Sequence, residues 1–129
     1  MKITLAKTAG FCFGVNRAVD MALKYASSSQ NVCTLGPIIH NENVVNDLKS
    51  KGVGVVQNPE DLKGDELVII RSHGVAPAVL ESVEKKAAAV VDATCPYVAK
   101  IHKTVAGTKT VLIAGDKNHE EVKGIVGHA

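Results

Sequence analysis

Apolar residues in this chain follow two alternating spacings. Short runs rich in β-branched residues predict buried strands at Ile3–Leu5, Val32–Leu35, Val53–Val56, Leu67–Ile70, Val90–Val91 and Thr110–Ala114. Between them, apolar residues three and four positions apart predict helices at Val15–Tyr25, Asn43–Ser50, Pro77–Lys86 and Pro96–Val105. Strands that alternate with helices are typical of an α/β fold built on a parallel sheet.

A faint internal repeat suggests how the chain is organised. The pattern Cys-x-x-Val-x-basic occurs at 12–17 and again at 95–100, and Gly-x-x-x-His-x-Glu occurs at 36–42 and again at 115–121. Repeated patterns of this kind indicate repeated structural units. We therefore expect a pseudo-repeat of parallel-sheet α/β units, with one complete unit in residues 1–95 and part of a second in residues 96–129.

Composition narrows the class of protein. The 129 residues carry a net charge of only +2, and the charged side chains are scattered, so nothing indicates a nucleic-acid surface. No apolar segment is long enough for a secretory signal core or a membrane span. The three cysteines form no Cys-x-x-Cys pair. These features predict a soluble cytoplasmic protein with reduced thiols and no membrane partner.

Five residues with reactive side chains fall at one kind of position, the junction between a predicted strand and the next helix. They are, in chain order, Cys12, His40, His73, Cys95 and His119. In a parallel sheet with right-handed crossovers these junctions gather at the carboxyl edge, where ligands of open α/β folds bind. We therefore expect these five side chains to form one site.

The chemistry of these residues indicates a metal and an anion. A cysteine before a helix lies in the positive field of the helix dipole, which favours the thiolate that binds metal, so Cys12 and Cys95 are candidate soft ligands for an iron–sulfur cluster. His40, His73 and His119 precede helices with free backbone N–H groups, a setting that suits phosphate. Glu121 is a candidate proton donor.

Two other interpretations fit the same residues. The chain would be a non-catalytic module if Cys12, Cys95 and nearby histidines held zinc while the remaining histidines bound a phosphorylated ligand. It would be a thiol enzyme if Cys12 were a nucleophile with His40 or His73 as its base.

The other cysteine and histidines are expected to have no chemical role. Cys33 lies inside an apolar strand and is predicted to be a buried structural thiol. We interpret His102 and His128 as solvated or terminal residues.

Five motifs occur in order over essentially the whole chain. They lie at Ala9–Ala18 (AGFCFGVNRA), Leu35–Asn41 (LGPIIHN), Arg71–Val75 (RSHGV), Asp92–Val98 (DATCPYV) and Asn118–Val122 (NHEEV). Together they resemble the 4-hydroxy-3-methylbut-2-enyl diphosphate reductase family. The last motif carries Glu120 where a proline is common. Members of the family are longer, and their third cysteine and a Ser-x-Asn motif have no counterpart here. We therefore expect an amino-terminal fragment or a truncated relative.

The resemblance implies a reaction and a set of site residues. The reaction is the last step of the methylerythritol phosphate route to isoprenoids, a two-electron reductive dehydroxylation of an allylic diphosphate to isopentenyl and dimethylallyl diphosphate. The family uses a [4Fe-4S] cluster held by three cysteines, of which Cys12 and Cys95 would be two. His40, His73 and His119 would contact the diphosphate, and Glu121 would relay protons. A ferredoxin- or flavodoxin-like protein would donate the electrons.

Overall fold

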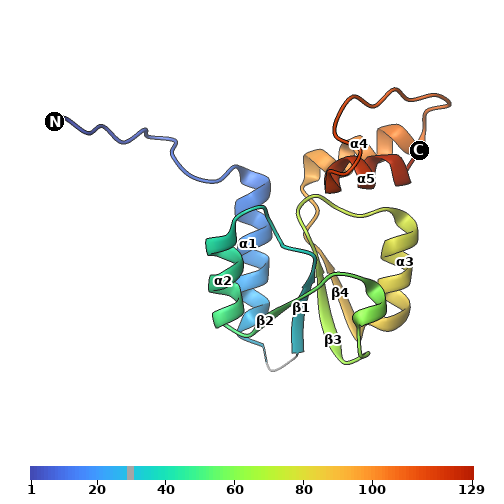
Figure 1. Ribbon diagram of the computed structural model, residues 1–129, viewed down its shortest axis with the longest axis horizontal. Coiled ribbons are helices and arrows are strands. Elements are labelled where there is room, and N and C mark those ends of the chain that lie inside the picture. The colour runs from blue at the N-terminus through green and yellow to red at the C-terminus, as the bar shows by residue number, and fades with distance from the viewer. Residues whose placement is uncertain (29–30) are drawn as a thin grey trace.

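The computed structural model describes residues 1–28 and 31–129 and contains one four-stranded parallel sheet. Its strands are β1 (Asn31–Leu35), β2 (Val53–Val56), β3 (Glu66–Ile70) and β4 (Ala89–Asp92), in the spatial order β2-β1-β3-β4 (Figure 1). All three neighbouring pairs are parallel. The predicted α/β fold with a parallel sheet is therefore confirmed.

Helices cover both faces of the sheet and its carboxyl edge. They are α1 (Phe13–Ala26), α2 (Glu42–Ser50), the short 3-10 helix η1 (Pro59–Asp61), α3 (Pro77–Lys86), α4 (Pro96–Ala106) and α5 (Glu120–Gly127). Helices α1 and α2 lie on one face, α3 and η1 lie on the other, and α4 and α5 lie side by side beyond the carboxyl ends of the strands (Figure 1). Within the described residues, no helix combines the length and apolar character that crossing a membrane requires.

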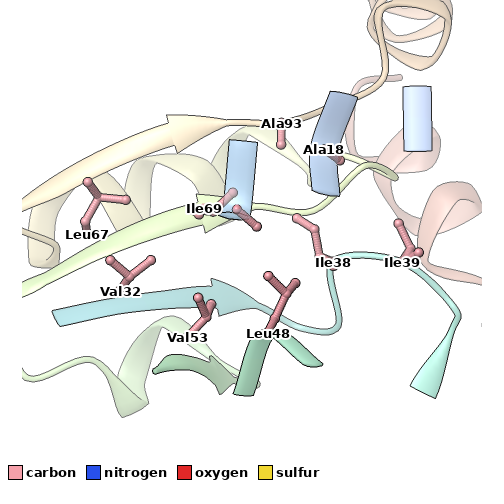
Figure 2. Close-up of a cluster of buried hydrophobic side chains, with 10 residues drawn as sticks. Ala18, Val32, Ile38, Ile39, Leu48, Val53, Leu67, Ile69 and Ala93 are labelled. Carbon is pink, nitrogen blue, oxygen red and sulfur yellow. The ribbon is translucent and has the colours of Figure 1, made fainter. Parts of the chain in front are cut away.

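Each face of the sheet has its own apolar core. Alternate residues of a strand point to opposite faces, so a strand covered on both sides is apolar throughout. On the face covered by α1 and α2, the core contains Ala18, Ala22, Val32, Ile38, Ile39, Leu48, Val53, Leu67, Ile69 and Ala93, nine of which are labelled in Figure 2. On the α3 face it contains Cys33, Leu35, Leu62, Val68, Ile70, Val75 and Val83. These two cores fix the strand ends from which the site residues follow.

Two of the six predicted strands are wrong. Residues Ile3–Leu5 and Thr110–Ala114 form no strand. Ile3 is 81% exposed and Leu112 is 96% exposed, and the first residues of the chain extend away from the sheet (Figure 1). A strand is stable only when a neighbour pairs with its backbone N–H and C=O groups. Neither segment has such a neighbour within the described residues. The proposed division of the chain at residue 95 stays a prediction.

Candidate functional site

Three of the predicted site residues, all histidines, meet beyond the carboxyl edge of the sheet. The ring centroids of His40 and His73 are 4.4 Å apart, those of His40 and His119 are 5.5 Å apart, and those of His73 and His119 are 5.9 Å apart. His40 follows β1, His73 follows β3, and His119 is the N-cap residue of α5. Three segments far apart in the sequence thus each contribute one imidazole. We call these side chains the histidine cluster.

Backbone hydrogen bonds beyond the strand ends connect the loops that carry His40, His73 and Cys95. The N–H of Ser72 donates to the carbonyl of Ile38 (3.2 Å), and the N–H of Cys95 donates to the carbonyl of Ser72 (2.9 Å). The parallel alignment of β1, β3 and β4 therefore continues into the loops. This places the loops bearing His40, His73 and Cys95 side by side.

His73 is the least hydrated of the three imidazoles. Burial, together with the neighbouring His40, Arg71 and His119, lowers the pKa of His73 to about 4. Its Nδ1 is buried and has no hydrogen-bond partner among the described residues. His73 is therefore neutral near pH 7, and its Nδ1 is an unpaired buried polar atom.

His119 and Glu121 form the start of α5. The Nδ1 atom of His119 accepts a hydrogen bond from the backbone N–H of Glu121 at 3.2 Å, which caps the helix. Glu121 is half-buried in the first turn. The helix start thus provides an imidazole, a carboxyl group and the positive end of a helix dipole within three residues.

The two candidate cysteine ligands occupy matching positions. Cys12 is the N-cap residue of α1 and Cys95 is the N-cap residue of α4, and neither side chain makes a capping hydrogen bond. The start of α1 packs on the Cys95 loop: a Cβ atom added at Gly14 would collide with the sulfur of Cys95, and Arg17 Nη1 donates to the carbonyl of Thr94 at 3.1 Å. Both sulfurs are thus unused and lie at adjacent helix N-termini.

This arrangement fits two ligands of an iron–sulfur cluster but is not a complete site. Soft thiolates at helix N-termini are the donors that such clusters use. Within the described part of the chain, no three His, Cys, Asp or Glu side chains are arranged so that they could hold a metal ion together. Cys33 faces the α3 core and is 4% exposed, and burial raises the pKa of its thiol to about 11. The prediction that Cys33 is a buried structural thiol is confirmed.

A groove lies beside the histidine cluster, at the start of α2. It has a volume of about 590 Å³, and its lining includes Ile39, His40, Asn41 and Val45. Asn41 caps α2 by accepting a hydrogen bond from the N–H of Val44 at 3.2 Å. His40 thus borders both the groove and the histidine cluster.

The interpretation of His102 as a solvated residue is wrong. His102 is 6% exposed, its ring stacks on that of His128 with a centroid distance of 4.0 Å, and burial together with His128 lowers its pKa. Its ring also packs against Gly74, where an added Cβ would come within 2.7 Å of the imidazole. A sequence signal was available, because His102 lies four residues after Val98 and three before Val105, both buried. His128 is half-buried rather than solvated.

An ion pair that sequence reasoning did not identify lies next to the histidine cluster. The Arg71 guanidinium pairs with the carboxylate of Glu120, which also accepts from Lys123 Nζ at 2.9 Å. Arg71 and Glu120 are 49 residues apart, so no local spacing could indicate the pair.

Comparison with known proteins establishes the family. The model of the LytB protein family matches residues 3–129. The chain belongs to this family. It is 50% identical to the 4-hydroxy-3-methylbut-2-enyl diphosphate reductase of Trichlorobacter lovleyi, over 99% of this chain and 47% of the relative. It is 48% identical to the reductase of Geobacter sulfurreducens, over 100% of this chain and 47% of the relative. The resemblance found in the motifs is confirmed.

Solved structures agree with this assignment. A structure described as that of the diphosphate reductase acting as terminal enzyme of the non-mevalonate pathway matches with a TM-score of 0.83 and 46% identity, over 98% of this chain and 46% of that one. The reductase from Plasmodium falciparum matches with a TM-score of 0.88 and 30% identity, over 95% of this chain and 40% of that one. The chain thus spans about half the length of these LytB relatives.

Proposed function

We propose that this chain supplies the diphosphate-binding histidines and two cysteine ligands of a 4-hydroxy-3-methylbut-2-enyl diphosphate reductase. The observation that carries the proposal is the histidine cluster, whose ring centroids lie 4.4 to 5.9 Å apart at the sheet edge that also holds Cys95. Three imidazoles from separate segments suit an anion with several oxygen atoms. The relatives of this chain are reductases of 4-hydroxy-3-methylbut-2-enyl diphosphate, which supports this choice of anion.

The residues at this edge of the sheet have different roles in the proposed reaction. His40, His73 and His119 would hold the diphosphate through ring N–H groups, and the free N–H groups at the start of α5 would add to the positive field. Holding the diphosphate fixes the position of the allylic hydroxyl relative to the two thiols. Binding and orientation are therefore the contribution of the histidine cluster.

Cys12 and Cys95 would hold two irons of a [4Fe-4S] cluster. When bound, such a cluster supplies electrons and a Lewis-acidic iron for removal of the hydroxyl. The overall reaction takes up two electrons and two protons: the C–O bond breaks, the hydroxyl leaves as water, and a C–H bond forms. We assign the protonation of the departing hydroxyl to Glu121, and the supply of electrons to a ferredoxin- or flavodoxin-like protein.

A chimera tests the proposed function directly. In it, this chain replaces the matching segment of the Trichlorobacter lovleyi reductase, so that the remainder of the relative is present. We expect the chimera, with reconstituted cluster and a chemical reductant under anaerobic conditions, to convert 4-hydroxy-3-methylbut-2-enyl diphosphate to the two isoprenoid diphosphates. A folded, cluster-loaded chimera that is inactive where the relative is active would refute the proposal.

The depressed pKa of His73 predicts a pH-dependent affinity for inorganic pyrophosphate. A bound anion stabilises the imidazolium, so the pKa of His73 is higher in the complex than its value of about 4 in the free chain. A group whose pKa rises on binding takes up a proton, and its contribution to affinity grows as the pH falls toward 4. We expect this contribution to increase by up to about tenfold per pH unit.

Titration calorimetry at pH 5 to 8 measures this effect by comparing the native chain with the His73→Asn variant. Protonation of pyrophosphate itself affects both chains equally, so the ratio of their affinities isolates His73. The ratio is expected to increase at lower pH. A ratio that stays constant over this range would contradict a rise in the pKa of His73 on anion binding.

A further inference from the structure

Arg71 joins the segment that bears His73 to the helix that bears His119. It directly follows β3, and its side chain is only 13% exposed. Its guanidinium pairs with Glu120, the first residue of α5. The second oxygen of the Glu120 carboxylate accepts from Lys123 Nζ at 2.9 Å, one turn further along α5. Both oxygens of this carboxylate are therefore engaged, and the carboxylate is fixed in place.

The turn after β1 also contacts the guanidinium. A Cβ atom added at Gly36 would collide with Arg71 Nη1, and the backbone φ of Gly36 is +68°, a conformation that favours glycine. The loop that begins at Gly36 leads to His40. Arg71 thus links the three segments that carry the imidazoles. Its guanidinium contacts Gly36, four residues before His40, and pairs with Glu120, one residue after His119. Arg71 itself lies two residues before His73.

Helix α5 needs such an attachment. It has eight residues, too few to be stable as an isolated helix. The segment that leads into it, residues 107–119, forms neither helix nor strand. Of the ion pairs formed by residues 1–28 and 31–129, the pair between Arg71 and Glu120 is the one that connects residues far apart in the sequence.

We infer that Arg71 and Glu120 are a positioning pair that holds α5 against the end of β3 and keeps His119 within reach of His40 and His73. The importance of the pair for anion binding rests on the proposed function. The guanidinium pairs with Glu120 through Nη2 and packs against the Gly36 turn through Nη1, while its buried Nε has no hydrogen-bond partner among the described residues. We assign to it the role of placing α5. A direct contact between Arg71 and the diphosphate is the competing possibility, and the two make opposite predictions for Glu120.

The first measurement is amide hydrogen exchange of α5 in the ligand-free chain. We expect residues 120–127 to exchange about tenfold faster in the Arg71→Gln and Glu120→Gln variants, and Arg71→Lys to recover part of the protection because it keeps the positive charge. The matched control is Glu81→Gln, which removes an exposed ion pair within α3, and it should leave the exchange of α5 unchanged. Unchanged exchange in both test variants would overturn the positioning pair.

The second measurement is a double-mutant cycle on binding of inorganic pyrophosphate. A positioning pair predicts that Arg71→Gln, Glu120→Gln and the double variant each weaken binding by a similar factor of about ten, because each removes the same ion pair. Direct contact predicts instead that Glu120→Gln strengthens binding, since it frees the guanidinium, while Arg71→Gln weakens it. That second pattern would overturn our inference.

The two measurements separate failure of the inference from failure of the proposed function. Faster exchange of α5 in the variants, together with no binding of pyrophosphate by the native chain, would support the positioning pair and refute the proposed anion site. If Arg71→Gln does not fold, Arg71→Lys and Glu120→Gln still test the pair. Circular dichroism of each variant identifies that case.

Discussion

Replacing Cys12 or Cys95 by serine is expected to abolish assembly of an iron–sulfur cluster, while Cys33→Ser leaves it intact. A serine hydroxyl is a harder donor than a thiolate and is not deprotonated near pH 7, so it does not replace a soft ligand. Each cysteine is the N-cap residue of a helix, and neither side chain makes a capping hydrogen bond. Cys33 is buried in the α3 core and its thiol stays protonated.

The measurement is anaerobic reconstitution with iron and sulfide in the chimera, followed by visible absorption and by iron and sulfide counts per chain. The Cys33→Ser variant is the matched control, because it makes the same chemical change at a buried site. Full cluster content in both Cys12→Ser and Cys95→Ser would contradict the assignment of the ligands.

Reconstitution also separates the alternatives raised by the sequence. A zinc-binding module would be colourless and redox-silent, and would hold zinc through Cys12 and Cys95 in place of a coloured cluster. A thiol enzyme would instead show alkylation of Cys12 alone at neutral pH. In the 129-residue chain by itself, a stable stoichiometric cluster would require an additional ligand, from Cys33 or from a second copy. If this chain alone assembles no cluster and the chimera assembles one, the site is shared between this chain and the remainder of the relative.

The parts of the fold that depend on local signals could be predicted from the sequence. The helix at Pro77–Lys86 has the predicted bounds, because a proline suits the first helical turn and its fixed φ begins the helix there. The apolar runs at Val53–Val56 and Leu67–Ile70 form strands of one sheet, one on each side of β1. The runs at Ile3–Leu5 and Thr110–Ala114 have the same local pattern, but a strand also needs a partner, which a local pattern does not specify.

The rule used to group the candidate site residues accounts for the positions of some of them and not of others. His40, His73 and Cys95 follow strands β1, β3 and β4, so the rule that loops gather at the carboxyl edge placed them together. Cys12 and His119 do not follow strands. They reach the edge because α1 packs on the Cys95 loop and α5 packs on α4. These are tertiary contacts, as is the pair between Arg71 and Glu120, and spacing along the chain does not reveal them.

Replacing Glu121 by glutamine is expected to lower the turnover of the chimera by about 10²–10⁴-fold, the usual contribution of a general acid. Glutamine has nearly the same size as glutamate, so the start of α5 is preserved, including the hydrogen bond from the backbone N–H of residue 121 to His119. The amide cannot deliver a proton to the departing hydroxyl. The KM should therefore change by only a few-fold, since the diphosphate is held by the histidine cluster.

Steady-state kinetics of the chimera under anaerobic conditions separates kcat from KM. The matched control is Glu84→Gln, the same substitution on the exposed surface of α3, which should leave both parameters unchanged. His119→Asn should show the opposite pattern to Glu121→Gln, with its main effect on KM, because an imidazole that anchors the diphosphate contributes to binding before the chemical step. If Glu121→Gln instead raises KM and leaves kcat near the native value, Glu121 is part of the anion site, and the proton must come from another group.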